Sequence, residues 1–461
     1  MTGRFEKLAI SDVGDFIYGI SPKPIKLANG MIIGGGIVYP EINFTLPPMD
    51  INEKTMEEVK RQYREMIDGI LTRASELTVP GLVVEVELLP PTTIHPEWGI
   101  EITNIVRDAM REYESRHGLK SVMRITPNDV RDMIRPPRMS EGPMLDAMLE
   151  TFRGCAQAGA EFLAIESTGG KEVHDDALLT CDLQAVIFSL GVMAARDMER
   201  LWKAIVSIAN ETGSIPSGDT ACGFGNTAMM LAEKGYIPRV FAAVVRVVSA
   251  VRSLVAYEAG AIGPSKDCAY EGPYIKAITG YPIAMEGKSA ACAHFSPLGN
   301  IAAAVADLWS NESVQNVKLL AGMAPTVSIE QLAYDCRLMN TASQDGRESA
   351  LKLRDWFVGS DSRLDPQAYV LRPDVVLMIS KEILRESTHY DQARAAAQAT
   401  IEALKAAGRE GRVIISDRER PWLEKMQKDL DAMPDTEDEA WRVVKERIDL
   451  NKVVLEDYGL A

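Results

Sequence analysis

The chain has 461 residues, of which 46% are hydrophobic and 25% are charged, and its formal net charge is −16. These values are typical of a globular protein with a sizeable core, built as one barrel-sized domain with an extension or as two domains. The negative charge argues against a nucleic-acid-binding protein, because neutralising backbone phosphates requires clustered Lys and Arg. We therefore expect no nucleic-acid partner and no long disordered stretch.

The cysteines and the N-terminus indicate the compartment. Six cysteines are spread over residues 155–336 without close pairs, and the first residues, MTGRFEKLAISD, contain no apolar signal core. This pattern predicts a reducing cytoplasm, in which thiols stay free for metal binding. The longest apolar segment, VFAAVVRVVSAVRSLVAY, is interrupted by arginines before it reaches the roughly 20 residues of a bilayer span. We expect no transmembrane helix and no membrane association.

Helix and strand patterns alternate from residue 53 onward. Helical periodicity is predicted at 53–77, 101–118 and 142–159, and each helix precedes a short apolar strand, at 81–90, 121–127 and 162–168. Further strands are predicted at 214–220, 281–287 and 317–325. This alternation implies parallel strands joined by right-handed crossovers. It favours an α/β fold of the (β/α)8 TIM-barrel type over a doubly wound sheet, whose phosphate loop is missing after the first strand.

Both ends of the chain are predicted to be additions to the barrel. We expect an N-terminal extension at 1–52, a catalytic β/α barrel at 53–375 and a helical C-terminal segment packed on the barrel at 376–461. Glycines and prolines within 31–49 predict a short hairpin or an extended arm rather than a barrel unit. In the tail, an alanine-rich helix is predicted at 391–408, and Pro-Asp-Thr signals another helix start at 434–436.

Three residues combine the chemistry of a metal site. Cys222 lies in GDTACGFGN, Cys268 lies in GPSKDCAYEG, and Glu166 ends the apolar run FLAIE. Polar residues directly after barrel strands have priority, because the active site of such a barrel lies at the carboxyl ends of its strands. Glycine-rich loops bring the backbone close to a metal or a substrate and rarely need a thiol for packing. One carboxylate and two thiols in these places suggest zinc with an open coordination position.

Other cysteine assignments stay open. A cysteine is more often a small buried residue than a ligand, and we assign Cys155, Cys181 and Cys336 to packing. Cys292 and His294, in SAACAHFSP, form a rival pair of ligands, because Cys-x-His can reach zinc. No paired C-x-x-C pattern occurs, so the spacing of the cysteines is a weak signal.

The carboxylates and the histidine also have simpler explanations. Glu166 fits a rim carboxylate paired with a Lys or Arg, and Glu87 and Arg124 follow other predicted strands in comparable positions. His174, in KEVHDD, fits a charged surface loop.

Two long segments carry a resemblance to a known family. GDTACGFGNTAMMLAEKGYIPRVFAAVVRVV and GAIGPSKDCAYEGPYIKAITGYPIAMEGKSAACAH resemble the zinc-containing catalytic subunits of the methanol:corrinoid methyltransferases of methanogenic archaea. The resemblance extends over essentially the whole chain. It implies a β/α barrel with added helices, which transfers the methyl group of methanol to the cobalt(I) of a corrinoid during methanogenesis from methanol. It also implies one zinc per chain, on Glu166, Cys222 and Cys268, with Glu161 as the rival for the glutamate.

The corrinoid is expected on a partner. The chain contains no D-x-H-x-x-G sequence, the motif that presents histidine to cobalt in corrinoid-binding domains. The resemblance implies a small corrinoid-binding protein, one for each catalytic subunit, around a homodimeric core in a heterotetramer.

Methanol activation needs more than the metal. Zinc is a Lewis acid for the methanol oxygen, but with two thiolates and one carboxylate the site carries a net charge of about −1, which weakens its pull on that oxygen. A nearby acid or cation should help the departing hydroxide. The candidates, which the sequence does not rank, are Asp219, Lys266, Glu286 and Lys288.

Two other functions compete. One is a zinc-dependent barrel lyase or hydrolase acting on a small carbonyl substrate, against which the low number of five histidines argues. The other is a non-catalytic assembly subunit whose helical tail binds a partner and whose cysteines only pack.

Overall fold

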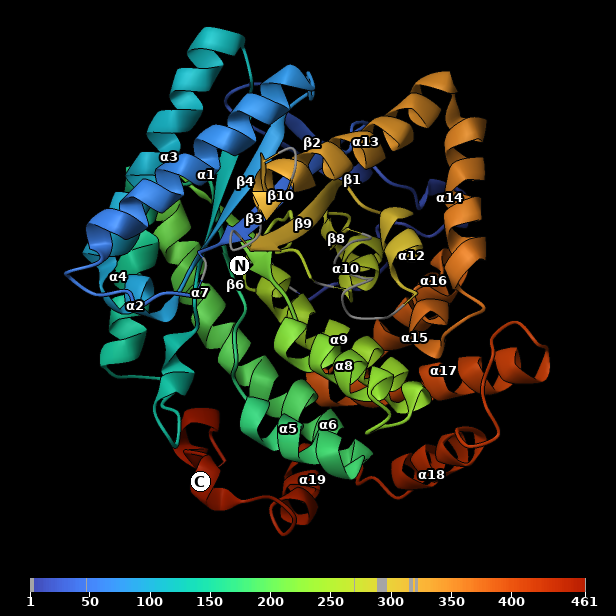
Figure 1. The fold of residues 1–461 in the computed structure, drawn as a ribbon. Helices are drawn as coiled ribbons and strands as arrows, with labels where there is room; N and C mark the ends of the chain where they lie inside the picture. Colours follow the sequence, from blue (N-terminus) through green and yellow to red (C-terminus); the bar gives the residue numbers. More distant parts are fainter. Residues whose placement is uncertain are drawn as a thin grey trace.

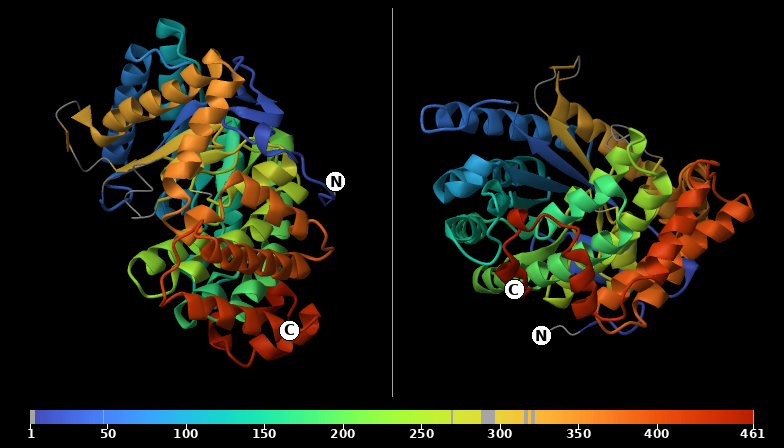
Figure 2. Two further views of the ribbon diagram at one scale, coloured as in Figure 1. Left: turned by 90° about the vertical axis from the view of Figure 1, so that its right-hand side faces the viewer. Right: turned by 90° about the horizontal axis from the view of Figure 1, so that it is seen from below.

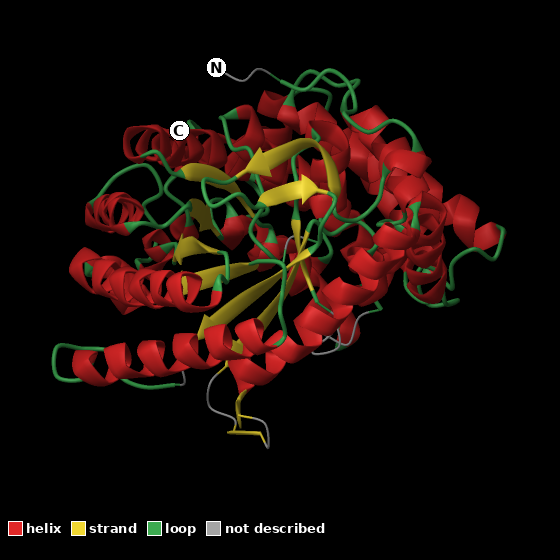
Figure 3. Ribbon diagram, turned by 90° about the horizontal axis from the view of Figure 1, so that it is seen from above, coloured by secondary structure: helices red, strands yellow, loops and turns green. Residues whose placement is uncertain are grey.

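The computed structural model describes residues 4–46, 48–268, 270–287, 297–314, 318–319 and 322–460. Its centre is a parallel seven-stranded sheet in the order β7-β6-β5-β4-β3-β9-β8. The strands are β3 (Tyr39–Thr45), β4 (Leu82–Leu88), β5 (Ser121–Pro127), β6 (Phe162–Ile165), β7 (Ile215–Asp219), β8 (Ala284–Glu286) and β9 (Leu308–Val314). Helices surround this sheet, as Figure 3 shows.

An irregular segment fills the place between β7 and β8. The Ile262 N–H donates to the Pro216 carbonyl of β7 (2.9 Å), and the Ala284 N–H of β8 donates to the Ser265 hydroxyl (3.3 Å). Pro264 has no N–H and Gly263 has a φ of 75°, so this segment cannot form a regular ladder. The strands therefore occupy the positions of a (β/α)8 barrel in sequence order. The irregular segment takes the sixth position, between β7 and β8. The predicted α/β barrel is confirmed.

Long helices follow the strands and cover the sheet (Figure 1). They are α1 (Met56–Glu76), α3 (Pro96–His117), α4 (Pro143–Ala158), α7 (Ala195–Thr212), α9 (Arg239–Glu258) and α13 (Ala324–Asp345). Shorter ones are α2 (Pro90–Ile94), α5 (Lys171–Thr180), α6 (Leu183–Phe188), α8 (Thr227–Glu233), α10 (Gly272–Thr279) and α12 (Gly299–Ala303). Helix α7 illustrates why they form: its apolar residues Leu201, Trp202 and Ile205 are buried on one face, and Gly213 ends it in the left-handed conformation.

Helix α9 is buried along its length. It is long and apolar enough to cross a membrane, but all of its apolar window lies inside the fold, as in the core helix of a globular protein. Arg246 and Arg252, which interrupt the apolar run, are fully buried and make hydrogen bonds to the loops at the carboxyl ends of the strands. The burial of α9 agrees with the expectation that this segment does not span a membrane.

Two expectations about strands are wrong. Residues 31–49 contain β3, a barrel strand, in addition to part of the hairpin formed by β1 (Ile20–Lys26) and β2 (Ile32–Gly35). The boundary expected at residue 52 therefore lies after the barrel has begun. In place of a barrel strand at 317–325, the structure has the short antiparallel pair β10 (Lys318–Leu319) and β11 (Gly322–Met323), and the last barrel strand is β9.

The C-terminal helices are α14 (Arg347–Asp361), α15 (Pro366–Tyr369), α16 (Pro373–Ile383), α17 (His389–Arg409), α18 (Arg420–Asp431) and α19 (Glu437–Val444). Helix α17 packs on α9, and α18 packs on α17. In Figure 2 these orange and red helices gather around the green central part of the chain. The boundary expected at residue 375 falls inside α16, so a limit there would divide one helix.

Candidate metal centre

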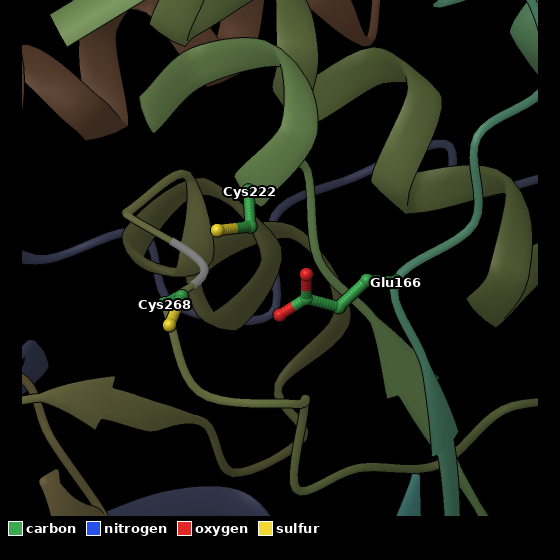
Figure 4. A group of neighbouring side chains, drawn as sticks. All are labelled: Glu166, Cys222 and Cys268. Atoms are coloured by element: carbon green, nitrogen blue, oxygen red, sulfur yellow. The ribbon is translucent and has the colours of Figure 1, made fainter. Parts of the chain in front are cut away.

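Glu166, Cys222 and Cys268 come from three consecutive barrel positions. Glu166 directly follows β6, Cys222 follows β7, and Cys268 follows the irregular sixth position. One oxygen of Glu166 and the two Sγ atoms lie within 4.8 Å of one another, and Figure 4 shows the three side chains pointing into the same space. Adjacent strand ends of a barrel converge in this way at its mouth.

A buried guanidinium joins the backbone beside two of these residues. Arg252 Nη2 donates to the carbonyl of Ser167 (2.7 Å) and to Asp219 Oδ1 (3.0 Å), while Nη1 donates to the carbonyl of Thr220 (3.0 Å). The Trp202 indole also donates to the Asp219 carboxylate (2.9 Å). Arg252 thus connects the segment after Glu166 to the segment before Cys222, and Asp219 is fully engaged in holding it.

A lysine lies among the carboxylates of the barrel interior. Lys266 is buried, and its Nζ lies 2.6 Å from Asp267 Oδ1, 3.1 Å from Glu166 Oε1, 3.3 Å from Glu85 Oε1 and 3.8 Å from Glu87 Oε2. Arg124, which pairs with Glu41 and lies 3.8 Å from Glu85, is the second cation of this cluster. Two cations therefore face five carboxyl groups (Glu41, Glu85, Glu87, Glu166 and Asp267), an acidic excess that favours a further cation or retained protons.

Burial governs ionisation at the mouth. It raises the pKa of Glu166 to about 7, against the opposing charge of Lys266, and raises the pKa of Glu286 to about 8. The hydrogen bond to Cys222 and burial together raise the pKa of the Cys268 thiol well above its usual range. A divalent cation bound between these groups would lower their pKa values and favour their ionised forms.

The turn after Glu166 has no room for a larger residue. A Cβ at Gly169 would overlap the side chain of Asp197, which pairs with the buried Arg131 (2.8 Å). We expect Gly169→Ala to lower the free energy of unfolding by about 1–3 kcal/mol through overpacking, measured by urea titration. Gly359→Ala is the matched control, because Gly359 is exposed in α14 with nothing near its Cβ position; it should leave stability equal or higher. Equal stability of Gly169→Ala and the wild type would contradict the tight packing of this turn.

The donor set fits zinc. Two sulfurs and one carboxylate oxygen are ligands that Zn²⁺ accepts, and three protein ligands leave a position open for a substrate. The Glu166 side chain keeps 31% of its surface exposed, so the site is accessible from one side. We therefore take zinc as the metal these residues suit.

Comparisons with known proteins identify the family of the chain. A family model described as methanol-cobalamin methyltransferase B subunit matches residues 2–459. The chain belongs to this family. A methanol–corrinoid protein co-methyltransferase of Methanosarcina barkeri (strain Fusaro / DSM 804) is 36% identical over 439 residues, which cover 94% of each chain. A crystal structure of the methanol:cobalamin methyltransferase complex MtaBC from Methanosarcina barkeri matches with a TM-score of 0.93 at 34% identity, covering 99% of this chain and 100% of that chain.

Membership of this family makes the chain a methyltransferase. It argues against both the lyase or hydrolase interpretation and the non-catalytic one.

Several candidates lie away from the cluster. Glu161 precedes β6 at the opposite end of the barrel, where its carboxylate accepts from the Met123 N–H (2.7 Å). His174 is not in a surface loop: it is fully buried in α5, with its ring edge against Phe224 (centroids 4.9 Å apart). It is buried because α5 packs on the helical turn that carries Cys222. Arg124 lies fully buried inside the barrel rather than at its rim.

The other predicted cysteines divide into two groups. Cys155, Cys181 and Cys336 are buried, as expected for residues that pack. Cys292 and His294, like Lys288, fall outside the described residues.

Two features beside the cluster go beyond the sequence predictions. Glu286 and Glu312 form a second group with Cys268, again with potential ligand atoms within 4.8 Å of one another. Asn226 contacts both cysteine loops. The sequence names Glu286 as an acid candidate but not as a potential ligand, and no local pattern distinguishes Asn226 or Glu312.

Proposed function

We propose that this protein transfers the methyl group of methanol to the cobalt(I) of a corrinoid bound to a partner protein, with zinc held by Glu166, Cys222 and Cys268. The observation that carries the proposal is the meeting of two thiols and one carboxyl group at the barrel mouth of a chain of this family. When bound, zinc supplies a Lewis acid that polarises the methanol oxygen and makes hydroxide a better leaving group.

The protein contributes position and charge. Lys266 Nζ, 3.1 Å from Glu166 Oε1, orients that carboxylate toward the thiols. The structure describes three of the acid candidates predicted from the sequence. Asp219 already accepts hydrogen bonds from Arg252 and Trp202, and Lys266 is surrounded by carboxylates. Glu286 Oε2 is buried beside Cys268 and has no hydrogen-bond partner among the described residues, which supports Glu286 as the group that holds a proton there.

The nucleophile has to reach the methyl carbon from outside the chain. Cys222 and Glu166 are only partly buried, whereas Cys268 and Glu286 behind them are buried. This exposure supports an approach through the mouth by a corrinoid carried on a small partner protein. We place the enzyme in the cytoplasm, in methanogenesis from methanol, as a homodimeric core with one corrinoid protein per subunit.

The test is a methyl-transfer assay with the zinc-loaded protein, its corrinoid partner reduced to cobalt(I), and methanol. The expected result is conversion of the cobalt(I) spectrum to that of methylcobalt(III), dependent on both proteins. Methylamine in place of methanol should give no conversion. Transfer from methylamine but not from methanol would contradict the proposed substrate.

A further inference from the structure

Asn226 links the two cysteine-bearing loops through one side-chain amide. Its Nδ2 lies 3.5 Å from Cys222 Sγ and 3.2 Å from the carbonyl oxygen of Cys268. We propose that Asn226 is a positioning residue that donates a hydrogen bond to the Cys222 sulfur and so sets the electrophilicity of the metal. This inference rests on the proposed function of the site.

The local fold brings Asn226 to the sulfur. Cys222 and Asn226 are the first and last residues of η4 (Cys222–Asn226), a single π-helical turn, which is a rare conformation that concentrates at functional sites. Cys268 has a φ of 57°, a left-handed conformation that is uncommon for a residue with a Cβ. Its carbonyl accepts from Asn226 and from the Tyr270 N–H (3.0 Å), which holds this conformation. One amide therefore fixes both loops relative to each other.

Arg246 determines which way the amide points. Its Nη1 donates to Asn226 Oδ1 (3.5 Å) and its Nη2 donates to the Gly225 carbonyl (3.3 Å). A guanidinium has donors only, so the oxygen of the amide must face Arg246 and the nitrogen must face the sulfur. Asn226 is 4% exposed and Arg246 is 1% exposed, so water does not compete for these contacts.

Arg246 is also a buried cation without a carboxylate within ion-pairing distance among the described residues; its guanidinium lies over the Tyr270 ring, 5.0 Å from the centroid. An unpaired buried charge is costly unless negative charge lies near it. Glu271 and Asp365 supply part of that negative charge, and Cys222 adds to it, with Asn226 hydrogen-bonded between the guanidinium and the sulfur. Arg252, the other arginine of α9, is instead paired with Asp219 (3.0 Å), so the two arginines have different roles.

The hydrogen bond from Asn226 to Cys222 Sγ offsets the weak Lewis acidity of a zinc ion that is bound by two thiolates and one carboxylate. An N–H directed at a thiolate withdraws electron density from sulfur, so less is donated to zinc and the metal remains a stronger Lewis acid. Among the described residues, Asn226 is the side-chain nitrogen donor to Cys222 Sγ. Without it, the metal should still bind, but in a looser site and with a weaker pull on the methanol oxygen.

The test compares the wild type with Asn226→Leu and Asn226→Ala after loading with zinc and, separately, with cobalt(II). Leucine keeps the volume of the side chain without its donor. We expect zinc affinity, measured by chelator competition, and kcat for methyl transfer each to fall about 10- to 100-fold, with little change in KM for methanol. The sulfur-to-cobalt(II) charge-transfer band should move to lower energy. Thr227→Ala is the matched control, because Thr227 bonds to the Gly223 carbonyl of the same turn (2.9 Å) without facing the sulfur; its band should match that of the wild type.

An Arg246→Met variant keeps the test decisive if both Asn226 variants fail to fold, because it releases the amide and should move the band in the same direction. A folded Asn226→Leu protein with wild-type zinc affinity and an unshifted band would overturn this inference while leaving the proposed function intact. A wild-type protein that binds neither zinc nor cobalt would overturn both.

Discussion

Replacing either Cys222 or Cys268 by alanine should remove zinc and lower methyl transfer from methanol at least about 1,000-fold, because Lewis-acid stabilisation worth several kcal/mol is lost. Each change leaves two of the three proposed ligands, too few for a stable site. Zinc content by elemental analysis, together with circular dichroism to confirm folding, measures the effect. Because Cys222 is the first residue of the short turn η4 and is only partly buried, its variant should keep its fold.

Cys336→Ala is the control for this pair. It removes the same thiol from α13, where Cys336 is 2% exposed and belongs to the apolar core. Its zinc content should equal that of the wild type. Full zinc in the folded Cys222 or Cys268 variant would remove that cysteine from the site and favour Cys292 and His294 as ligands.

Arg124→Met should lower the free energy of unfolding by about 3–5 kcal/mol, because it leaves a buried carboxylate without its partner. Arg124 and Glu41 are both fully buried, with Nε 2.6 Å from Glu41 Oε1. Arg124 Nη1 also donates to Ser217 Oγ (2.6 Å) and to the Pro264 carbonyl (2.9 Å), so it connects β3, β5, β7 and the irregular sixth position. Urea titration of the folded protein measures the loss.

A double variant separates the charge effect from packing. Adding Glu41→Gln to Arg124→Met removes the unpaired carboxylate, so part of the lost stability should return. On the surface, Arg61 pairs with Glu58 while 61% of its side chain is exposed, and Arg61→Met should leave the unfolding curve unchanged. Similar losses for Arg124→Met and Arg61→Met would show that the buried pair does not stabilise the barrel.

The barrel could be predicted from the sequence where its strands are apolar. β4, β5 and β6 are short β-branched or apolar runs between helical patterns, and each was predicted. β3 (YPEINFT) and β9 (LWSNESV) were missed because the side chains they turn into the barrel are polar. Glu41, Asn43 and Ser310 are buried there, and their partners lie in other strands or in the irregular segment. Hydrophobic periodicity cannot reveal a strand whose buried face is charged.

The candidate site also has a part that could be predicted from the sequence and a part that could not. Glycines beside Cys222 and Cys268, and the strand before Glu166, were local signals, so the cluster could be predicted. Its surroundings could not, because they depend on contacts between distant segments. The Arg246–Asn226 contact joins α9 to a π-helical turn 20 residues earlier, and Glu312 approaches Cys268 through the pairing of separate strands. Such contacts follow from barrel closure and not from local spacing.

Anomalous diffraction at the zinc absorption edge, on crystals of the purified protein, tests the proposed site most directly. The expected result is one strong peak per chain, within bonding distance of Glu166 Oε, Cys222 Sγ and Cys268 Sγ, with a position left open toward the barrel mouth. A peak beside Cys292 and His294, or no peak in protein that transfers methyl groups from methanol, would contradict zinc activation at Glu166, Cys222 and Cys268.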